Sequence, residues 1–430
     1  MQPILIEFPG LGSFSREWLE EQPERAQELL AKCKGRYPLC GCREPGLPLY
    51  IARRNRLYLA RVPNSGPQHA PFCPSYEPER AQCGWSIYSP KALAESGEGA
   101  VSVKLGVPIL IRGEHAGAAT LGTSPVGGEH LLREALGLPG LLHLLWERAE
   151  FNRWSPRMRH RRHYRQIHKY LLETAETVQV RRFPLTRHLY IPEPYAPDQA
   201  LEIEARRQRA FRELSQTASG VPMRILVFGR LRAVVETADG PGMRLAHLPN
   251  EFVISVAREK LARLRQTTRF AWLDARAIHP EFQLLLLLTM QRATHGQWQL
   301  DEGVGMVTTE EFIPVFTMED ALLAKRLVTE DRHFYKPLPY DAPTTRVPSF
   351  VLTDCGDTAV PVEIIAGSAA ETAARRLRLA EYEAASRRCA AWDVGEQPLP
   401  PDLPAATHSA AARPTGRTRA AVVARPEVDP

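Results

Sequence analysis

The stretch Cys40-Gly-Cys42, followed further on by His69-Ala-Pro-Phe-Cys73, decides how the first hundred residues fold. Between these two ends lie two near-copies rich in strand-forming residues, Leu49-Tyr-Ile-Ala-Arg53 and Leu57-Tyr-Leu-Ala-Arg61. The sequence Arg54-Asn55-Arg56 is typical of a turn between two strands. An antiparallel hairpin brings its open ends together, so we expect the two cysteines of the first end to lie beside His69 and Cys73.

Three sulfurs and one imidazole, from Cys40, Cys42, Cys73 and His69, make a complete tetrahedral zinc site. Completeness favours a structural zinc, because a catalytic zinc keeps one position open for water. Iron would fit the same ligands. Two alternatives stay open: the residues are ordinary buried thiols beside a surface histidine, or a flanking cysteine, Cys33 or Cys83, replaces one of the ligands.

Composition points to a folded protein of several domains. The chain has 430 residues with 44% hydrophobic content, enough for two or three cores. Seven cysteines, an odd number, fit reduced thiols and a metal site better than a disulfide framework. Met1 is not followed by a basic and then apolar signal, and the longest apolar runs, such as Leu284 to Leu288, are far too short to span a bilayer. These observations predict a soluble, cytoplasmic protein with no membrane contact.

Positive charge is concentrated in one segment. The formal net charge of +6 is modest for this length, but Arg, Lys and His dominate from Arg148 to Arg187. We expect the densest run, residues 157–169, to be a helix with one packed stripe and arginines on its other faces. The candidate nucleic-acid-binding residues are its cations: Arg157, Arg159, Arg161, Arg162, Arg165 and Lys169.

Two shorter helices are expected before this basic helix, over residues 129–136 and 141–150, separated by the breaker Gly137-Leu-Pro-Gly140. Two short helices followed by an arginine helix form the arrangement of a helix-turn-helix or winged-helix unit. Such a cationic helix neutralises phosphates, so we expect nucleic acid as the partner, with DNA the first candidate. The alternative is a solvated basic face on a structural helix.

The sequence pattern divides the chain into five parts and predicts an α+β, multidomain fold. The parts are a zinc-binding α+β domain over 1–98, a helix-turn-helix-like basic segment over 99–180, a linker and helix over 181–220, an α/β domain over 221–395 and a disordered tail over 396–430. Inside the α/β domain we expect a hairpin about Gly229-Arg230 and a helix over 251–266. Two further elements are expected over 282–290 and 297–307.

The last folded stretch resembles the core of the PD-(D/E)xK nuclease fold. It has the pattern of a helix over 317–327, two strands over 347–354 and 360–365, and an Arg-rich helix over 371–388. In that fold, acidic residues on neighbouring strands bind a divalent ion, here Mg²⁺, which activates water against a phosphodiester. The resemblance implies catalytic roles for Glu363, for Glu319 on the helix, and for Asp354 or Asp341 as a substitute acid.

Two positions depart from the nuclease pattern. Ser349 stands where the aspartate is expected, and Ile365 stands where the lysine is expected. Arg375 or Arg376 would have to replace the lysine, but arginine does not transfer protons. An active nuclease, an inactive nuclease-like fold and an unrelated α+β end therefore remain as alternatives.

Most of residues 1–395 resembles an uncharacterised bacterial family, domain-of-unknown-function family 1173. The resemblance is carried by Cys40-x-Cys42, the Leu-Tyr-Ile-Ala-Arg hairpin, His69-x3-Cys73, Leu145-Trp-Glu-Arg-Ala149 with Asn152-Arg-Trp154, and Lys336-Pro-Leu338. Members often lie near integrative and conjugative elements, so the resemblance implies a mobile-element context without an established activity. Members carry Pro-Asp-Phe where this chain has Pro348-Ser-Phe350.

Three functions are therefore expected, in order of preference. The first is a zinc-containing nucleic-acid-binding protein of a mobile or conjugative element, whose nuclease-like end binds without cutting. The second is a divalent-metal-dependent nuclease. The third is a scaffold in a conjugation or replication complex, with basic surfaces that meet acidic proteins.

Overall fold

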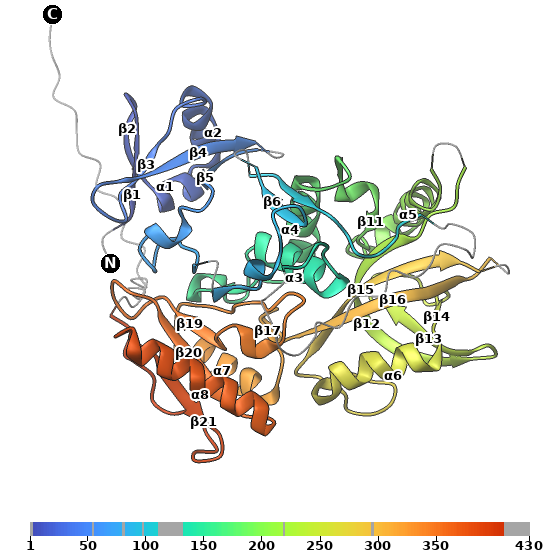
Figure 1. The fold of residues 1–430 in the computed structure, drawn as a ribbon. Coiled ribbons are helices and arrows are strands. Elements are labelled where there is room, and N and C mark those ends of the chain that lie inside the picture. The colour runs from blue at the N-terminus through green and yellow to red at the C-terminus, as the bar shows by residue number, and fades with distance from the viewer. Residues whose placement is uncertain are drawn as a thin grey trace, which may run out of the picture.

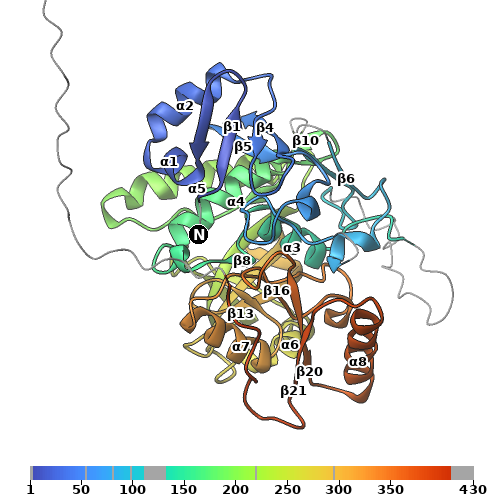
Figure 2. The ribbon, with the colours of Figure 1, turned by 90° about the vertical axis from the view of Figure 1, so that its left-hand side faces the viewer.

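The computed structural model describes residues 3–53, 56–79, 82–96, 99–110, 132–217, 220–293 and 296–407. Helices and strands are mixed throughout these residues, and their strands form four sheets, which confirms the predicted α+β class. In Figure 1 the N-terminal part lies at the upper left, the C-terminal part below it, and a barrel at the right. Helix α3 (Leu138–Arg148) lies at the centre both there and in Figure 2.

The N-terminal part is a five-stranded sheet with two helices. Its strands follow the order β2-β1-β3-β4-β5, and its elements are β1 (Leu5–Phe8), β2 (Gly12–Ser15), α1 (Arg16–Glu21), α2 (Pro23–Lys32), β3 (Leu39–Cys40), β4 (Leu47–Arg53) and β5 (Leu57–Arg61). The predicted hairpin is confirmed, since β4 and β5 are antiparallel with Leu49 opposite Arg61. Of its predicted turn, Arg54-Asn55-Arg56, the first two residues lie outside the described residues.

The basic segment differs from the predicted three helices. The helix expected over 141–150 is confirmed as α3, but residues 132–136 form bridges to Tyr88 and Leu105 instead of a helix. Residues 129–131 lie outside the described part. The last helix, α4 (Tyr164–Thr177), begins seven residues later than predicted. Pro156 opens a short 3₁₀ turn there, and His160 has a φ of +59°, which an α-helix does not tolerate.

A four-stranded sheet lies next to these helices. Its order is β10-β9-β7-β6, with β6 (Leu93–Glu95), β7 (Val101–Val103), β9 (Val178–Val180) and β10 (Phe183–Pro184). The β9–β10 connection is a two-residue turn, Arg181-Arg182, with φ values of +51° and +72°. Residues 181–220, predicted as a linker and helix, also supply β11 (Leu189–Tyr190), which pairs with the barrel, and α5 (Ala200–Leu214).

The sheet of the α/β region closes into a five-stranded barrel. The strands pair in the order β12-β13-β14-β16-β15, and β15 pairs back with β12; they are β12 (Ile225–Thr237), β13 (Gly240–Leu245), β14 (Ile254–Ser255), β15 (Gln283–Arg292) and β16 (Trp298–Thr308). Helix α6 (Arg258–Thr267) connects β14 to β15, and β17 (Pro314–Val315) pairs with β16. Alternate residues of β15 face opposite cores: Leu284 packs in one, and Leu285 packs with α3 in the other.

The hairpin predicted about Gly229-Arg230 is wrong, because β12 runs from Ile225 to Thr237 without a turn. Gly229 is a place of close approach: a Cβ there would lie 2.9 Å from Cδ1 of Leu245. The register of β12 against β13 shifts between Leu231 and Ala233, which bends the strand. The glycine therefore fits the curvature of a barrel instead of a turn.

The C-terminal sheet has the order β21-β20-β19-β18-β8. Its elements are β8 (Arg153–Trp154), α7 (Met318–Thr329), β18 (Phe334–Tyr335), β19 (Phe350–Leu352), β20 (Val360–Ile365), α8 (Ala369–Ala384) and β21 (Ala390–Asp393). The predicted helix–strand–strand–helix order is confirmed. Strand β8 comes from the basic segment, so this sheet joins two of the predicted parts.

The first residues of the predicted disordered tail are ordered. Residues 396–407 lie along the C-terminal part, where Arg326 donates to the carbonyl of Pro401 at 2.7 Å and Arg332 donates to that of Pro404 at 2.9 Å. Residues 408–430 lie outside the described residues. Among the described helices, none has the length and apolar character needed to cross a membrane.

Candidate metal centre and basic surface

The four predicted metal ligands meet beside the N-terminal sheet. One ligand atom from each of Cys40, Cys42, His69 and Cys73 lies within 4.8 Å of the others. Cys40 ends β3 in the middle of the sheet, between β1 and β4, and the N–H of Gly41 donates to the carbonyl of Leu5 at 2.9 Å. The hairpin β4–β5 then returns the chain to the same place, as the sequence predicted.

The distances between ligand atoms fit a tetrahedral metal. Cys40 Sγ lies 3.6 Å from Cys73 Sγ, and His69 Nδ1 lies 3.3 Å from Cys42 Sγ and 3.7 Å from Cys73 Sγ. A zinc ion bonded at about 2.3 Å to sulfur and about 2.0 Å to nitrogen gives edges of roughly 3.8 Å and 3.5 Å. Within the described residues, Cys33 and Cys83 are not part of the group, so neither replaces a predicted ligand.

The electrostatics of the cluster also suit a cation. Cys40, His69 and Cys73 are buried, and Cys42 is half-buried. Hydrogen bonds from Cys42 and Cys73 lower the pKa of Cys40, while hydrogen bonds to Cys40 and Cys42 raise the pKa of Cys73. A bound dication would favour loss of the thiol protons, because the thiolate is the form that binds a metal.

The sequence did not predict the hydrogen bonds that hold the loop carrying Cys73. The backbone N–H of Ser75 donates to Cys73 Sγ at 3.4 Å, and Arg16 donates to the hydroxyl of Ser75 at 2.6 Å. Both groups orient the loop that carries Cys73. Arg16 is 57 residues away from Cys73 in the sequence, so no local pattern predicts the contact. Bound zinc at this site would serve to hold β3 and the His69–Cys73 loop together.

The predicted DNA-contacting cations divide into paired and unpaired side chains. Arg157 forms an ion pair with Glu17 at 3.1 Å, and Arg159 forms one with Asp331 at 2.8 Å. Both pairs are with residues of other parts of the chain, and both arginines keep some exposure. Arg157 and Arg159 therefore already have a carboxylate to satisfy them.

Arg162 points into the protein. Its guanidinium donates to the carbonyl of Phe151 at 2.8 Å and to the carbonyl of Arg153, and it lies 5.4 Å from the ring centroid of Trp154. Burial lowers the pKa of Arg162 to about 9. In this arrangement its donors serve backbone carbonyls, and the side chain is not free to meet a phosphate.

Three of the predicted cations are both exposed and without an ion pair in the described part of the chain, and three further exposed cations, which were not among the predicted residues, follow in the β9–β10 turn and just after it. None of the six has a carboxylate partner among the described residues; together they are named the basic surface: Arg161, Arg165, Lys169, Arg181, Arg182 and Arg187. The short 3₁₀ helix Leu185–Arg187 packs against α4, which joins the two groups. The Arg-Arg pair just before Phe183-Pro184 was the available sequence signal.

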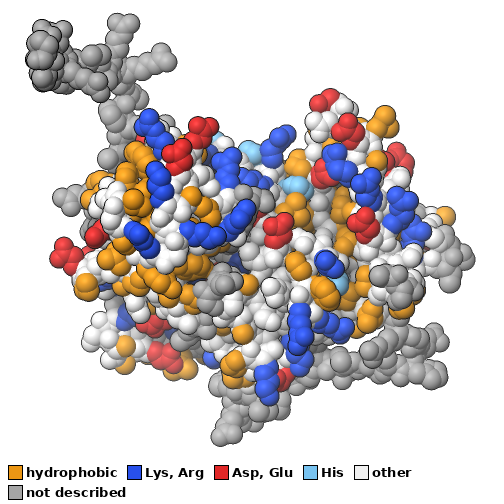
Figure 3. All heavy atoms as spheres, turned by 90° about the horizontal axis from the view of Figure 1, so that it is seen from above, with side chains coloured by type: hydrophobic (Ala, Val, Ile, Leu, Met, Phe, Trp, Pro, Cys, Tyr) orange, Lys and Arg blue, Asp and Glu red, His pale blue; other side chains and the backbone are white. Residues whose placement is uncertain are grey.

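Positive charge on the upper face of the molecule is divided. In Figure 3 the Lys and Arg side chains form several groups with Asp, Glu and hydrophobic side chains between them. Because the positive charge is separated into groups, it would attract a polyanion more through local contacts than through long-range electrostatic steering.

The predicted catalytic acids are not brought together. Glu363 on β20 is fully buried, with Arg375 at 2.7 Å from one carboxylate oxygen and Arg378 at 3.0 Å from the other. Asp354 accepts two hydrogen bonds from Arg332, both at 2.8 Å. Glu319 lies in the first turn of α7, and in the described part of the chain these acids form no metal-sized group.

The acid that α7 turns inward is Asp320, the neighbour of the predicted Glu319. Its carboxylate lies 2.8 Å from Lys336 Nζ, which also donates to the carbonyl of Ser349 at 2.8 Å. The hydroxyl of Ser349 accepts from the N–H of Ile364 at 3.1 Å. These contacts tie α7, β18 and the hairpin β19–β20 together. The sequence prediction named Glu319 from the order of the secondary-structure elements. It did not consider which residue of α7 faces inward, and that residue is Asp320.

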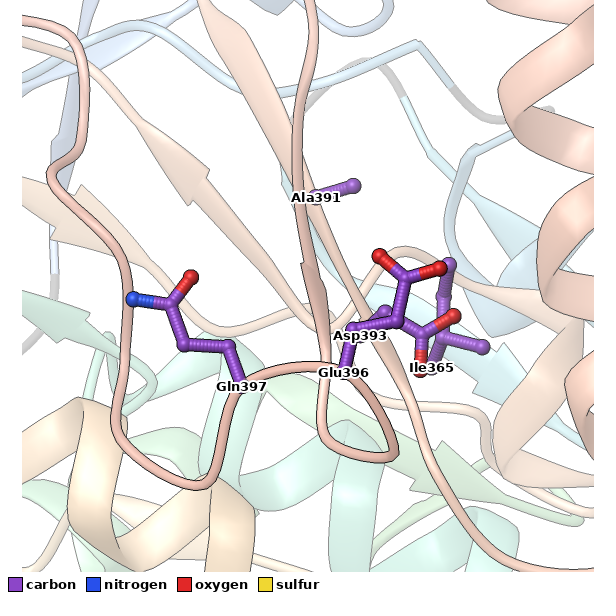
Figure 4. Close-up of a pocket in the computed structure, with 5 residues that line it drawn as sticks. All are labelled: Ile365, Ala391, Asp393, Glu396 and Gln397. Atoms are coloured by element: carbon purple, nitrogen blue, oxygen red, sulfur yellow. The ribbon is translucent and has the colours of Figure 1, made fainter.

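A surface hollow of about 560 Å³ lies at the end of β20 and β21, shown in Figure 4. Its lining includes Asp393, Glu396 and Gln397, and none of the predicted catalytic residues. The carboxylate of Asp393 is held by Arg376 at 2.7 Å. The hollow therefore does not offer the paired free acids that a catalytic metal needs.

Comparison with known proteins places the chain in one family. No curated protein and no solved structure matches it. The family model described as "Protein of unknown function (DUF1173)" matches residues 14–395, which is most of the 430 residues and includes the four cluster residues. The chain therefore belongs to the DUF1173 family of proteins of unknown function.

Proposed function

We propose that this protein is a zinc-containing nucleic-acid-binding protein whose basic surface contacts phosphates. The observation that carries the proposal is that the six cations of the basic surface are exposed and have no carboxylate partner in the described part of the chain. Some other arginines, such as Arg148 and Arg332, are paired with acids. Unpaired cations are free to replace the counterions of a phosphate backbone.

The zinc in this proposal is structural. All four positions of the cluster come from the protein, so no position is left for water or substrate. Its role is to fix the N-terminal sheet, whose helix α1 meets the basic segment through the Glu17–Arg157 pair. The ion thereby stabilises the support of the basic surface without contacting nucleic acid itself.

The biological setting is part of the proposal. The family resemblance suggests a bacterial mobile or conjugative element, which makes DNA the nucleic acid to test first. A cytoplasmic location fits seven cysteines without a disulfide, because thiols stay reduced there.

The test is DNA binding measured by fluorescence anisotropy over a series of salt concentrations. We expect the combined variant Arg161→Glu, Arg165→Glu and Lys169→Glu to lose affinity and to reduce the slope of log affinity against log salt by about 2 to 3. The matched control reverses three exposed cations of the N-terminal part, Arg25, Lys32 and Lys34, and should bind as the wild type does.

Failure of the wild type to bind DNA or RNA with salt-dependent affinity would overturn the proposal. A scaffold in a conjugation or replication complex, with acidic protein partners, would then take its place. Equal loss in the reversed variant and its control would locate binding outside the basic surface.

A divalent-metal-dependent nuclease is the second proposal. It is supported by the order α7-β18-β19-β20-α8-β21, with an acid, Glu363, on β20. It requires Arg375 and Arg378 to release that carboxylate for Mg²⁺. Cleavage of labelled DNA with Mg²⁺ or Mn²⁺, present in the wild type and lost in Glu363→Gln, would support it. Absence of cleavage by the wild type would reject it.

A further inference from the structure

We propose that a hollow beside the β9–β10 turn receives an unpaired nucleobase, so that the ligand of this protein is a single-stranded nucleic acid. This inference rests on the proposed nucleic-acid binding and names its substrate class. The hollow measures about 440 Å³, within the roughly 300–1,000 Å³ typical of ligand pockets. Its lining includes Phe183, Thr186, Arg187, His188, Glu213 and Gln216.

Phe183 supplies a surface for stacking. Its side chain is 50% exposed, although large apolar rings usually pack inside. The guanidinium of Arg187 lies 5.2 Å from the ring centroid, so a cation accompanies the ring. An exposed aromatic ring beside arginine is the combination on which proteins stack the bases of single strands.

Two further cations stand next to this ring along the chain. Arg181 and Arg182 form the turn immediately before Phe183, both with positive φ, and both are exposed. Neither has a carboxylate partner in the described residues. Three consecutive residues therefore offer a single nucleotide two cations for its phosphate, Arg181 and Arg182, and a ring for its base, Phe183. A duplex keeps its bases stacked inside, so this arrangement suits a single strand better.

Polar groups in the hollow suit the edge of a base. His188 Nδ1 is buried without a hydrogen-bond partner in the described part of the chain. Burial, with Arg181 and Arg187 nearby, lowers the pKa of His188, so the imidazole is neutral at pH 7. The amide of Gln216 adds a donor and an acceptor. Glu213 repels a phosphate but accepts hydrogen bonds from base amino groups, which favours a base inside and phosphates outside.

The barrel gives independent support for the same ligand class. With β12, β13, β14, β15 and β16 counted as strands one to five, the pairing order is 1-2-3-5-4-1; strands three and five are parallel, and α6 lies between strands three and four. This is the strand order of the OB fold, many members of which bind oligonucleotides. A fold alone does not fix a function, so the proposal rests on the hollow.

The test compares a single-stranded oligonucleotide with the duplex of the same sequence, using the full chain with its metal. We expect Phe183→Ala to weaken single-strand binding by roughly 5- to 150-fold, the effect of losing one stacked base. The slope of affinity against salt should stay unchanged, because no charge is removed. Duplex binding should not change. The matched control is Tyr37→Ala, which removes a ring that is 61% exposed on the N-terminal part.

A second variant separates charge from stacking. Arg182→Ala should reduce the single-strand salt slope by about 0.7, the value for one phosphate contact. If Phe183→Ala binds the single strand as the wild type does, the hollow does not receive a base, although DNA binding by the basic surface still stands. If the wild type binds neither form, the proposed function fails, and this inference fails with it.

Discussion

Cys40 combines a structural and a chemical role in one residue. Its backbone pairs with Ile6 in β1 and with Leu47 in β4, so the sheet fixes the position of its sulfur before a metal binds. That sulfur is 3.6 Å from Cys73, at the end of a loop closed by the hairpin. Because Cys40 is held by hydrogen-bonded strands and the other three ligands lie in the loops beside them, the free energy of binding a metal there would add to the stability of the N-terminal part.

Replacing Cys40 should therefore remove both the metal and part of the fold. We expect the wild type to hold one zinc per chain by elemental analysis, and Cys40→Ser to hold none and to unfold at a lower temperature. Cys389→Ser is the control, because this half-buried thiol lies outside the cluster. Full zinc content in Cys40→Ser would show that the four residues are not the ligands, and iron in the wild type would correct the identity of the metal.

Arg161 and Arg162 are adjacent in the sequence but have opposite surroundings. We expect Arg162→Ala to lower the free energy of unfolding by about 2–4 kcal/mol, because several backbone carbonyls lose a charged donor. Arg161→Ala, which removes an exposed side chain, should change it by about 0.5 kcal/mol or less. Urea unfolding measures both. Equal effects of the two changes would contradict the inward position of Arg162.

No sequence rule separates these two arginines. The separation depends on the first residue of α4, and a helix over 157–169 would have put the arginines on its outer faces. The chain instead turns at His160, whose backbone is left-handed with a φ of +59°. Composition predicts a basic segment, but the backbone decides which of its cations reach solvent.

At the scale of elements, the largely apolar helix α3 buries one acidic residue, Glu147. Glu147 belongs to the Leu145-Trp-Glu-Arg-Ala149 motif, is buried, and has one carboxylate oxygen without a hydrogen-bond partner among the described residues. Burial and then the nearby Glu77 raise the pKa of Glu147 to about 8. The hydroxyl of Tyr335 and the cations Arg153 and Arg61 oppose this shift only partly.

The raised pKa makes stability depend on pH in a definite direction. In the unfolded chain Glu147 ionises near pH 4.3, whereas in the folded protein it stays neutral up to about pH 8, so its contribution is lost as the pH rises between these values. We expect Glu147→Gln to gain about 2–4 kcal/mol of stability over the wild type between pH 5 and pH 8.5. Urea unfolding at the two pH values tests this. A difference that does not grow with pH would mean that the carboxyl is ionised in the fold.

Elements with local patterns were predictable, and elements set by distant neighbours were not. The repeated Leu-Tyr-x-Ala-Arg predicted β4 and β5 correctly because alternation within a strand is local. The sequence predicted a turn at Gly229 inside what is one strand, β12. A glycine in a turn and a glycine packed closely against Leu245 look the same in a sequence. Likewise, nothing local to Glu363 indicates that Arg375 and Arg378 occupy both of its oxygens.

At the scale of the whole molecule, the predicted parts share their cores. Tyr335 and Val351 of the C-terminal sheet pack in the same cluster as Ile6, Cys40 and Cys73 of the N-terminal part. Strand β8 and helix α3 come from the basic segment, yet β8 completes the C-terminal sheet and α3 covers the barrel. Long-range pairing of this kind cannot be predicted from composition. The domain boundaries predicted from the sequence therefore separate residues that pack in one core.

This shared packing implies that removal of a metal bound at the Cys3His cluster would affect residues beyond the N-terminal part. We expect chelation to raise amide hydrogen exchange in β1 and in the β3–β4–β5 region, and also in β18 and β19, because Tyr335 and Val351 lose the surface against which they pack. The barrel strand β15 serves as the internal control, since its partners are β12 and β16 and its side chains pack in other clusters. Exchange that rises in the N-terminal strands alone would mean that the two parts unfold independently. A rise that spreads to β19 but spares β15 would mean that the metal stabilises the C-terminal sheet through the Cys40 core, so that metal content controls the stability of residues more than 300 positions away from the first ligand.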